Sequence, residues 1–197
     1  DGYIGKPLGA AGFMISHGHE TWHPDPEFYY KYGGGPMFDM GPYYLTAMVN
    51  LLGNVKEVFA MTKTTFPVRT ITSEQIQVEV PTHYVGTLEF ENDVTATLTT
   101  TFDVYYKGSS RLEIYGTEGT LYVPDPNTFG GPVKLLRPEH GEIMEMPLMF
   151  DYKVNSRALG LADMAKAIQT GRRPRANGDM TYHVLEIMEG FAQSGRE

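Results

Sequence analysis

The stretch GGGPMFDMGPYYLTAMVNLLG, residues 33–53, joins a run of glycines to an amphipathic segment. Glycines before a helix can form a phosphate-binding turn, but that fingerprint requires an apolar strand followed by G-x-G-x-x-G. Here the glycines are consecutive, the polar segment PEFYYKY precedes them, and the chain contains no G-x-G-x-x-G. The glycines therefore predict a sharp turn or a close backbone approach, not a nucleotide cradle.

A helix is predicted from about Pro36 to Leu52, because proline suits the first helical turn. One side of this helix is apolar and predicts core; it carries Phe38, Leu45, Met48, Val49 and Leu52. Asp39 and Tyr43 lie together on another side, one turn apart. A carboxylate and a phenol so placed can bind hydroxyl groups and pass a proton, which makes them candidate catalytic residues. The alternative is a solvated face whose first-turn aspartate favours the helix dipole.

A second polar cluster, SHGHETWHPDPEF, occupies residues 16–28. Together with a tyrosine of the following helix it suggests the wall of a pocket for a hydroxylated ligand, since an aromatic face packs well on a sugar ring. The candidate wall residues are His17, His19, Trp22, His23 and Tyr44. The three histidines could instead hold zinc, although no tight second pair of ligands is evident. They could also lie at the surface with no special role.

The order of predicted elements is helix, then a run of strands, then two helices, and this order indicates an α+β fold. Strands are predicted at residues 8–16 and 55–66, at 82–104 in two parts, at 111–123 in two parts, and at 133–138. The length fits one domain over residues 1–197. Hairpins between neighbouring strands predict a large open, mostly antiparallel sheet with helices on one face. Ser156 and Asp179 are predicted to cap the last two helices, and Gly171 to end the first of them.

One predicted strand has two distinct faces. Its apolar face carries Val94, Ala96, Leu98 and Phe102, and its other face carries Thr95, Thr97, Thr99 and Thr101. Threonine suits a strand and tolerates water. The threonine face is therefore either a solvated surface or a flat oligomer interface.

The overall composition excludes several classes of partner. The 197 residues carry a net charge of −8, which argues against nucleic acid or an anionic membrane as the main partner. No apolar window reaches the ~18 residues that a transmembrane helix needs. Cysteine is absent, which excludes disulfides. A cytoplasmic location is the expectation.

Two stretches together resemble a known family. GGGPMFDMGPYYLTAMVNLLG and NSRALGLADMAKAIQTGRRPRANGDMTYHVLEIMEGF, residues 155–191, are similar to the C-terminal half of Gfo/Idh/MocA proteins, which are NAD(P)-dependent sugar and polyol dehydrogenases. The family pattern is a glycine run, an aspartate and, four residues later, a histidine or tyrosine. This chain matches it with glycines 33–35, Asp39 and Tyr43. A tyrosine in the last position is typical of the branch that resembles glucose–fructose oxidoreductase.

The resemblance implies a dihydrodipicolinate-reductase-like C-terminal domain whose open sheet forms homo-oligomers. It implies that substrate binds between this domain and a Rossmann domain, with Asp39 on substrate hydroxyls and Tyr43 as the acid/base. A free phenol has a pKa near ~10, so a tyrosine base needs a nearby cation. The family supplies it as a lysine of an E-K-P motif in the Rossmann half; Lys6, in GKP before the first strand, is not that lysine.

By the same resemblance, NAD or NADP would bind the full-length protein, and none is expected on this piece alone, which should be inactive by itself. The expected ligand is a small sugar, inositol or related polyol. A non-catalytic sugar-binding or assembly module remains the alternative, because this chain contains neither a dinucleotide fingerprint nor the family lysine.

Overall fold

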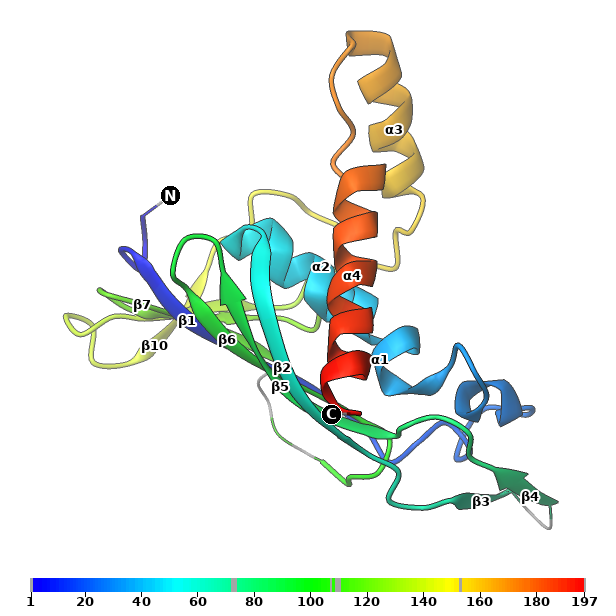
Figure 1. Ribbon diagram of the computed structural model, residues 1–197. Helices are drawn as coiled ribbons and strands as arrows, with labels where there is room; N and C mark the ends of the chain where they lie inside the picture. Colours follow the sequence, from blue (N-terminus) through cyan, green and yellow to red (C-terminus); the bar gives the residue numbers. More distant parts are fainter. Residues whose placement is uncertain (1, 72–73, 107, 109–110, 153, 197) are drawn as a thin grey trace.

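One large sheet and two helices packed on it organise the chain (Figure 1). The computed structural model describes every residue except 1, 72–73, 107, 109–110, 153 and 197. The strands of the sheet are β1 (Pro7–Ile15), β2 (Val55–Lys63), β5 (His83–Phe90), β6 (Thr95–Thr101), β7 (Leu112–Gly116), β8 (Thr120–Val123), β9 (Val133–Leu136) and β10 (Ile143–Met146). Their order is β10-β9-β8-β7-β1-β6-β5-β2.

Within the described residues, five helical segments and a separate hairpin complete the fold. The helical segments are η1 (Glu27–Tyr30), α1 (Gly35–Asp39), α2 (Gly41–Leu52), α3 (Leu159–Thr170) and α4 (Gly178–Ser194). The hairpin pairs β3 (Val68–Ile71) with β4 (Glu74–Gln77). In Figure 1, α2 and α4 lie on the same side of the sheet, whereas α3 extends away from it beyond α4. The fold is thus α+β, as the sequence predicts.

The pairing of the sheet is antiparallel except between β1 and β6, which run parallel. Its register separates two faces, because side chains alternate along a strand. Ala96 and Leu98 of β6 are buried on the helix side, whereas Thr95 and Thr97 are exposed on the other. Thr101 departs from the predicted threonine face: it is buried, and its hydroxyl accepts a hydrogen bond from the Asp103 N–H.

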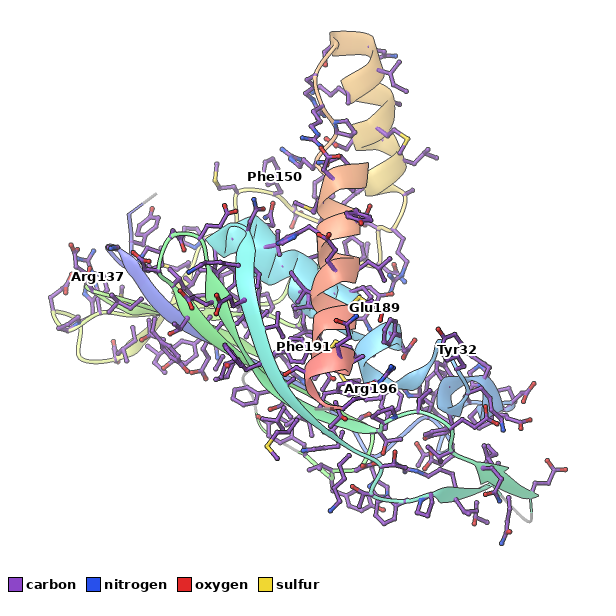
Figure 2. The ribbon with its side chains drawn as sticks, viewed as in Figure 1. Tyr32, Arg137, Phe150, Glu189, Phe191 and Arg196 are labelled. Atoms are coloured by element: carbon purple, nitrogen blue, oxygen red, sulfur yellow. The ribbon has the colours of Figure 1, made fainter. Side chains whose placement is uncertain are left out.

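The core lies between this sheet and the helices α2 and α4. Leu45 and Met48 of α2 are fully buried, as their spacing predicts. Phe191 points from α4 toward the sheet (Figure 2) and is fully buried. The helix comes close there because Gly86 of β5 has no side chain: a Cβ at that position would lie 2.5 Å from Cε1 of Phe191. Burying a side chain such as Phe191 stabilises the fold by about 1.5–3 kcal/mol.

The stretch 33–53 forms two helices instead of the single predicted one. The helix breaks at Met40, between α1 and α2, and Pro42 stands in the first turn of α2. Proline has no N–H to donate to the preceding turn, so it ends the first helix and starts the second. The glycine run makes the turn before α1: Gly33 and Gly35 have φ values of 85° and 80°, which favour glycine.

Three other sequence predictions are corrected. The β3–β4 hairpin and β10 were not foreseen, because their strands are four residues long and carry little apolar alternation. Asn177, not Asp179, caps α4: its side chain accepts from the Met180 N–H. Ser156 was expected to cap α3, but Ala158 is the residue at that position and its side chain provides no cap. Gly171 ends α3 in the left-handed conformation, as predicted.

Among the described helices, none has the length and apolar character that a membrane span requires.

Gly34→Ala should destabilise the protein because the backbone passes close at this point. A Cβ on Gly34 would lie 2.6 Å from the Phe28 carbonyl oxygen and 2.7 Å from that of Tyr29, and backbone atoms cannot move aside cheaply. We expect a loss of about 1–3 kcal/mol in the free energy of unfolding, measured by urea denaturation. Gly160→Ala in α3, where no atom lies within 4 Å, is the control and should be neutral or stabilising. Equal midpoints for the two variants would contradict the close approach.

Candidate active site

A cavity of about 440 Å³ lies where the end of β1 meets the break between α1 and α2. Five of the seven predicted site residues line it, and they are His19, Trp22, Asp39, Tyr43 and Tyr44. Asp39 ends α1 and Tyr43 belongs to α2, so the predicted pair stands on two helices, yet both residues border the same cavity. The single-helix geometry was wrong because of Pro42, but the two side chains still come together.

His19 fixes the Asp39 carboxylate. Its Nε2 lies 2.9 Å from Oδ2 of Asp39, and the two side chains are 11% and 28% exposed. The His19 ring is itself held by aromatic neighbours: its centroid lies 4.2 Å from that of Tyr29 and 4.5 Å from that of Phe102. The carboxylate is therefore oriented by a partner on another segment, which distinguishes it from an aspartate on a freely solvated helix face.

The consecutive tyrosines of α2 have different surroundings. Tyr44 is buried and donates a hydrogen bond to Oδ1 of Asp125, 3.1 Å away, so its hydroxyl is already committed. Burial raises the pKa of Tyr44 above that of a free phenol, and the nearby negative charge of Asp125 raises it further. Tyr43 is half-buried, and its hydroxyl makes no hydrogen bond to any described residue. Of the two, Tyr43 has the hydroxyl that is available to a ligand.

Burial and the nearby charge of Asp39 also raise the pKa of Tyr29, another residue of the cavity wall. Both effects disfavour the phenolate. Tyr29 and Tyr44 therefore keep their protons at neutral pH, and the proton of Tyr44 is donated to Asp125.

Two of the predicted wall residues lie outside this cavity. His17 stacks on Tyr105 with ring centroids 3.7 Å apart, and its Nδ1 lies 3.2 Å from the Asp103 carbonyl oxygen. Nδ1 of His23 accepts from the Asp25 N–H at 3.1 Å. Neither residue is among those that line the cavity. Throughout the described part of the chain, no group of three His, Cys, Asp or Glu residues is placed to hold a metal ion, so the zinc alternative gains no geometric support.

Several residues of the cavity wall were not predicted from the sequence, among them the polar residues Arg111, Asn127 and Arg157. The guanidinium of Arg157 lies 5.8 Å from the Tyr43 ring centroid, within cation–π range, and its Nη2 donates to Oδ1 of Asn127 at 3.3 Å. Arg157 therefore places a positive charge beside Tyr43 from within this chain. No local motif signals it, because it is 114 positions away from Tyr43 and only the fold brings it near.

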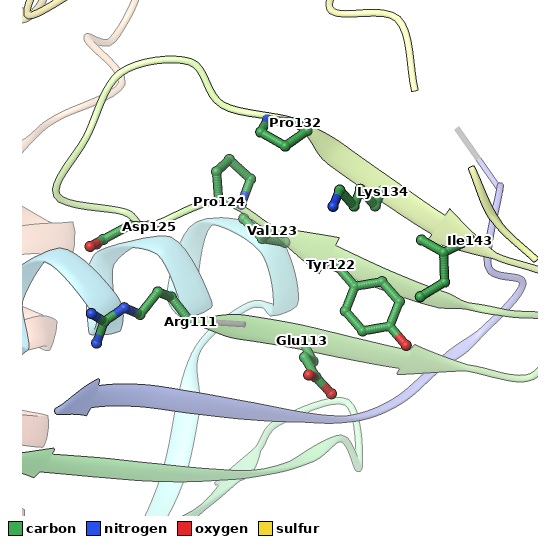
Figure 3. Close-up of a pocket in the computed structure, with 9 residues that line it drawn as sticks. All are labelled: Arg111, Glu113, Tyr122, Val123, Pro124, Asp125, Pro132, Lys134 and Ile143. Carbon is green, nitrogen blue, oxygen red and sulfur yellow. The ribbon is translucent and has the colours of Figure 1, made fainter. Parts of the chain in front are cut away.

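A second depression of about 360 Å³ lies at the β7–β10 end of the sheet (Figure 3). Glu113, Tyr122 and Lys134 face it from β7, β8 and β9, where they stand opposite one another in the register. It shares Arg111 and Asp125 with the first cavity but contains none of the predicted site residues. Of these two cavities, the first brings together an acid, a fixed histidine and a phenol whose hydroxyl has no described hydrogen-bond partner.

Comparison with known proteins identifies the class. A model of the GFO/IDH/MocA C-terminal domain matches residues 1–122, and the chain belongs to this family of oxidoreductases. A search of curated protein sequences finds no match.

Solved structures share the fold. An NAD-binding oxidoreductase from Klebsiella pneumoniae is 18% identical with a TM-score of 0.78, covering 99% of this chain and 58% of its own. The apo form of levoglucosan dehydrogenase is 16% identical with a TM-score of 0.79 and the same two coverages. An aldose-aldose oxidoreductase from Caulobacter crescentus, complexed with glycerol, is 22% identical with a TM-score of 0.74, covering 100% of this chain and 55% of its own. The chain therefore spans little more than half the length of these structures.

Loss of the hydroxyl should change the free energy of unfolding differently at Tyr43 and at Tyr44. Tyr44→Phe removes a donor from Asp125 and should lower the free energy of unfolding by about 1–3 kcal/mol. Tyr43→Phe removes no described hydrogen bond and should change it by less than ~0.5 kcal/mol. Chemical denaturation of both variants tests this. Equal destabilisation would show that the Tyr43 hydroxyl has a structural partner and is not available to a ligand.

Proposed function

We propose that residues 1–197 form the substrate-binding domain of an NAD(P)-dependent oxidoreductase that acts on a sugar, inositol or related polyol. The observation that carries this proposal is the convergence of Asp39 and Tyr43 on one cavity, with the carboxylate fixed by His19 at 2.9 Å. The names of the structural neighbours support it, since levoglucosan dehydrogenase and aldose-aldose oxidoreductase act on sugars and share this fold.

The proposed roles follow from the hydrogen-bonding atoms that each side chain leaves available to a substrate. Oδ1 of Asp39 accepts hydrogen bonds from substrate hydroxyls, while Oδ2 is bonded to Nε2 of His19. Tyr43, whose hydroxyl has no described hydrogen-bond partner, acts as the phenolate and takes the proton of the hydroxyl that is oxidised. Arg157, whose guanidinium lies 5.8 Å from the Tyr43 ring centroid, stabilises this phenolate before the transfer. The exposed ring of Trp22 can cover the apolar face of the sugar.

The cofactor is proposed to be NAD or NADP, bound mainly by a part of the protein outside this chain. Its nicotinamide, when bound, would accept the hydride from the carbon whose hydroxyl Tyr43 deprotonates. Residues 1–197 contain no dinucleotide fingerprint, and the neighbouring structures, one of them a complex with NADH, are almost twice as long. We therefore expect the isolated chain to lack redox activity.

The catalytic proposal is tested in the complete protein with NAD or NADP and a panel of aldoses, inositols and sugar alcohols. Tyr43→Phe should lower kcat by about 10²–10⁴-fold without lowering the melting temperature, because the proton acceptor is lost. Tyr182→Phe, an exposed tyrosine of α4, is the control and should retain full activity. Undiminished turnover of Tyr43→Phe would remove Tyr43 from the mechanism.

An assembly role for the open sheet face is a second proposal. Side chains opposite one another on β2 and β5 leave large apolar groups exposed there: Met61, paired in register with Val85, is 80% exposed, and Phe59, paired with Thr87, is 63% exposed. Exposed apolar patches of this kind commonly mark protein interfaces. We propose that a second copy of the chain covers this face and forms a homo-oligomer.

Met61→Lys should weaken this association, because a charge would be buried in the interface. Light scattering should give a mass above that of the monomer for the unmodified protein and a mass nearer the monomer for Met61→Lys. Met149→Lys, at an equally exposed methionine outside the sheet, is the control and should leave the mass unchanged. A monomeric unmodified protein would refute the assembly proposal without affecting the catalytic one.

A further inference from the structure

A buried group of charges lies beside the cavity but does not line it. Arg69, on β3 of the small hairpin, is 4% exposed, and it pairs with two acids from other segments. Its Nη1 donates to Oε1 of Glu20 at 2.8 Å, and its Nη2 donates to Oδ1 of Asp103 and, at 3.0 Å, to the Phe102 carbonyl oxygen. Such a buried charge must be paired, because leaving it without partners would cost several kcal/mol.

The remaining oxygens of the two acids are also occupied. Tyr30 donates to Oε2 of Glu20, and Thr82 donates to Oδ2 of Asp103 at 2.8 Å. The guanidinium also lies 5.2 Å from the Tyr30 ring centroid, within cation–π range. Every oxygen of both carboxylates therefore has a partner, so the positions of Glu20 and Asp103 are determined by contacts from several segments.

These contacts reach two neighbours of His19, Glu20 and Phe102. Glu20 is the next residue in the chain, and Phe102, whose carbonyl Arg69 holds, packs its ring 4.5 Å from the His19 ring. Gly18, on the other side of His19, has a φ of 92°, a backbone conformation that favours glycine. The turn that carries His19 is thus held in place by Arg69, from 50 positions along the chain.

We infer that Arg69 is a positioning residue: by holding Glu20 and Phe102 it aims Nε2 of His19 at Asp39, and so orients the carboxylate that receives substrate. This inference rests on the proposed function for its effect on turnover, but the geometry it claims exists without substrate. The β3–β4 hairpin gains a role as well. A two-stranded hairpin is marginally stable alone, and here it delivers a buried arginine to the site.

The test is a double-mutant cycle in the complete protein, with the best substrate of the polyol panel. Arg69→Lys keeps the charge but cannot bond Glu20 and Asp103 through two separate nitrogens. It should lower kcat/KM about 10- to 100-fold, since misplacing a site residue by about 1 Å has effects of that size. In a His19→Gln background, Arg69→Lys should lower kcat/KM by less than about threefold, because Arg69 acts through His19. Arg173→Lys, at an exposed arginine, is the control and should be silent in both backgrounds.

A merely structural role would give the same loss in both backgrounds, and that result would overturn the inference. Should Arg69→Lys fail to fold, Glu20→Gln, which keeps the shape of the side chain, enters the same cycle with the same expectation. Failure of the proposed function looks different: Tyr43→Phe would keep full turnover, or no polyol would be oxidised.

A second measurement needs no turnover. The imidazole nitrogen resonances of His19, assigned by their loss in His19→Gln, report its hydrogen bond to Asp39. In Arg69→Lys they should move toward their positions in Asp39→Asn, whereas Arg173→Lys should leave them in place. Unshifted resonances in Arg69→Lys would overturn the inference even if every substrate failed.

Discussion

The hydrogen bond between His19 and Asp39 joins two segments that meet only because of the fold around them. His19 lies on the turn after β1, and Asp39 is the last residue of α1. The bond requires that α1 stop where it does, and the break at Pro42 ensures this. It also requires that the glycine turn pass close to the backbone of residues 28–29, which only Gly34 permits. The carboxylate's orientation thus depends on backbone constraints at both ends of α1.

Much of the fold was predictable from residue patterns. Alternation in β6 separated buried Ala96 and Leu98 from exposed Thr95 and Thr97, and the apolar spacing of α2 identified Leu45 and Met48 as core. The break in the first long helix was missed because the apolar spacing continues across Pro42. The β3–β4 hairpin was missed because its strands are short and their burial depends on contacts with distant segments.

The candidate site was predictable only in part, for a related reason. Asp39 and Tyr43 are neighbours in sequence and carry a family pattern, so a local reading could pair them. Arg157, Asn127 and Asp125 approach them from remote parts of the chain, and no local spacing encodes that. The pairing of Tyr44 with Asp125, which leaves Tyr43 as the tyrosine with a free hydroxyl, likewise depends on tertiary contact. Arg157 places a positive charge beside the Tyr43 ring, whereas the family resemblance leads us to expect a cation from another domain.

The most direct test of the proposed site is a crystal structure of the complete protein with NAD or NADP and its proposed polyol substrate. We predict a substrate hydroxyl within hydrogen-bond distance of the Tyr43 hydroxyl, a neighbouring substrate hydroxyl bonded to Asp39, and His19 still bonded to that carboxylate. A substrate bound at the β7–β10 depression, or one that contacts neither Asp39 nor Tyr43, would contradict it.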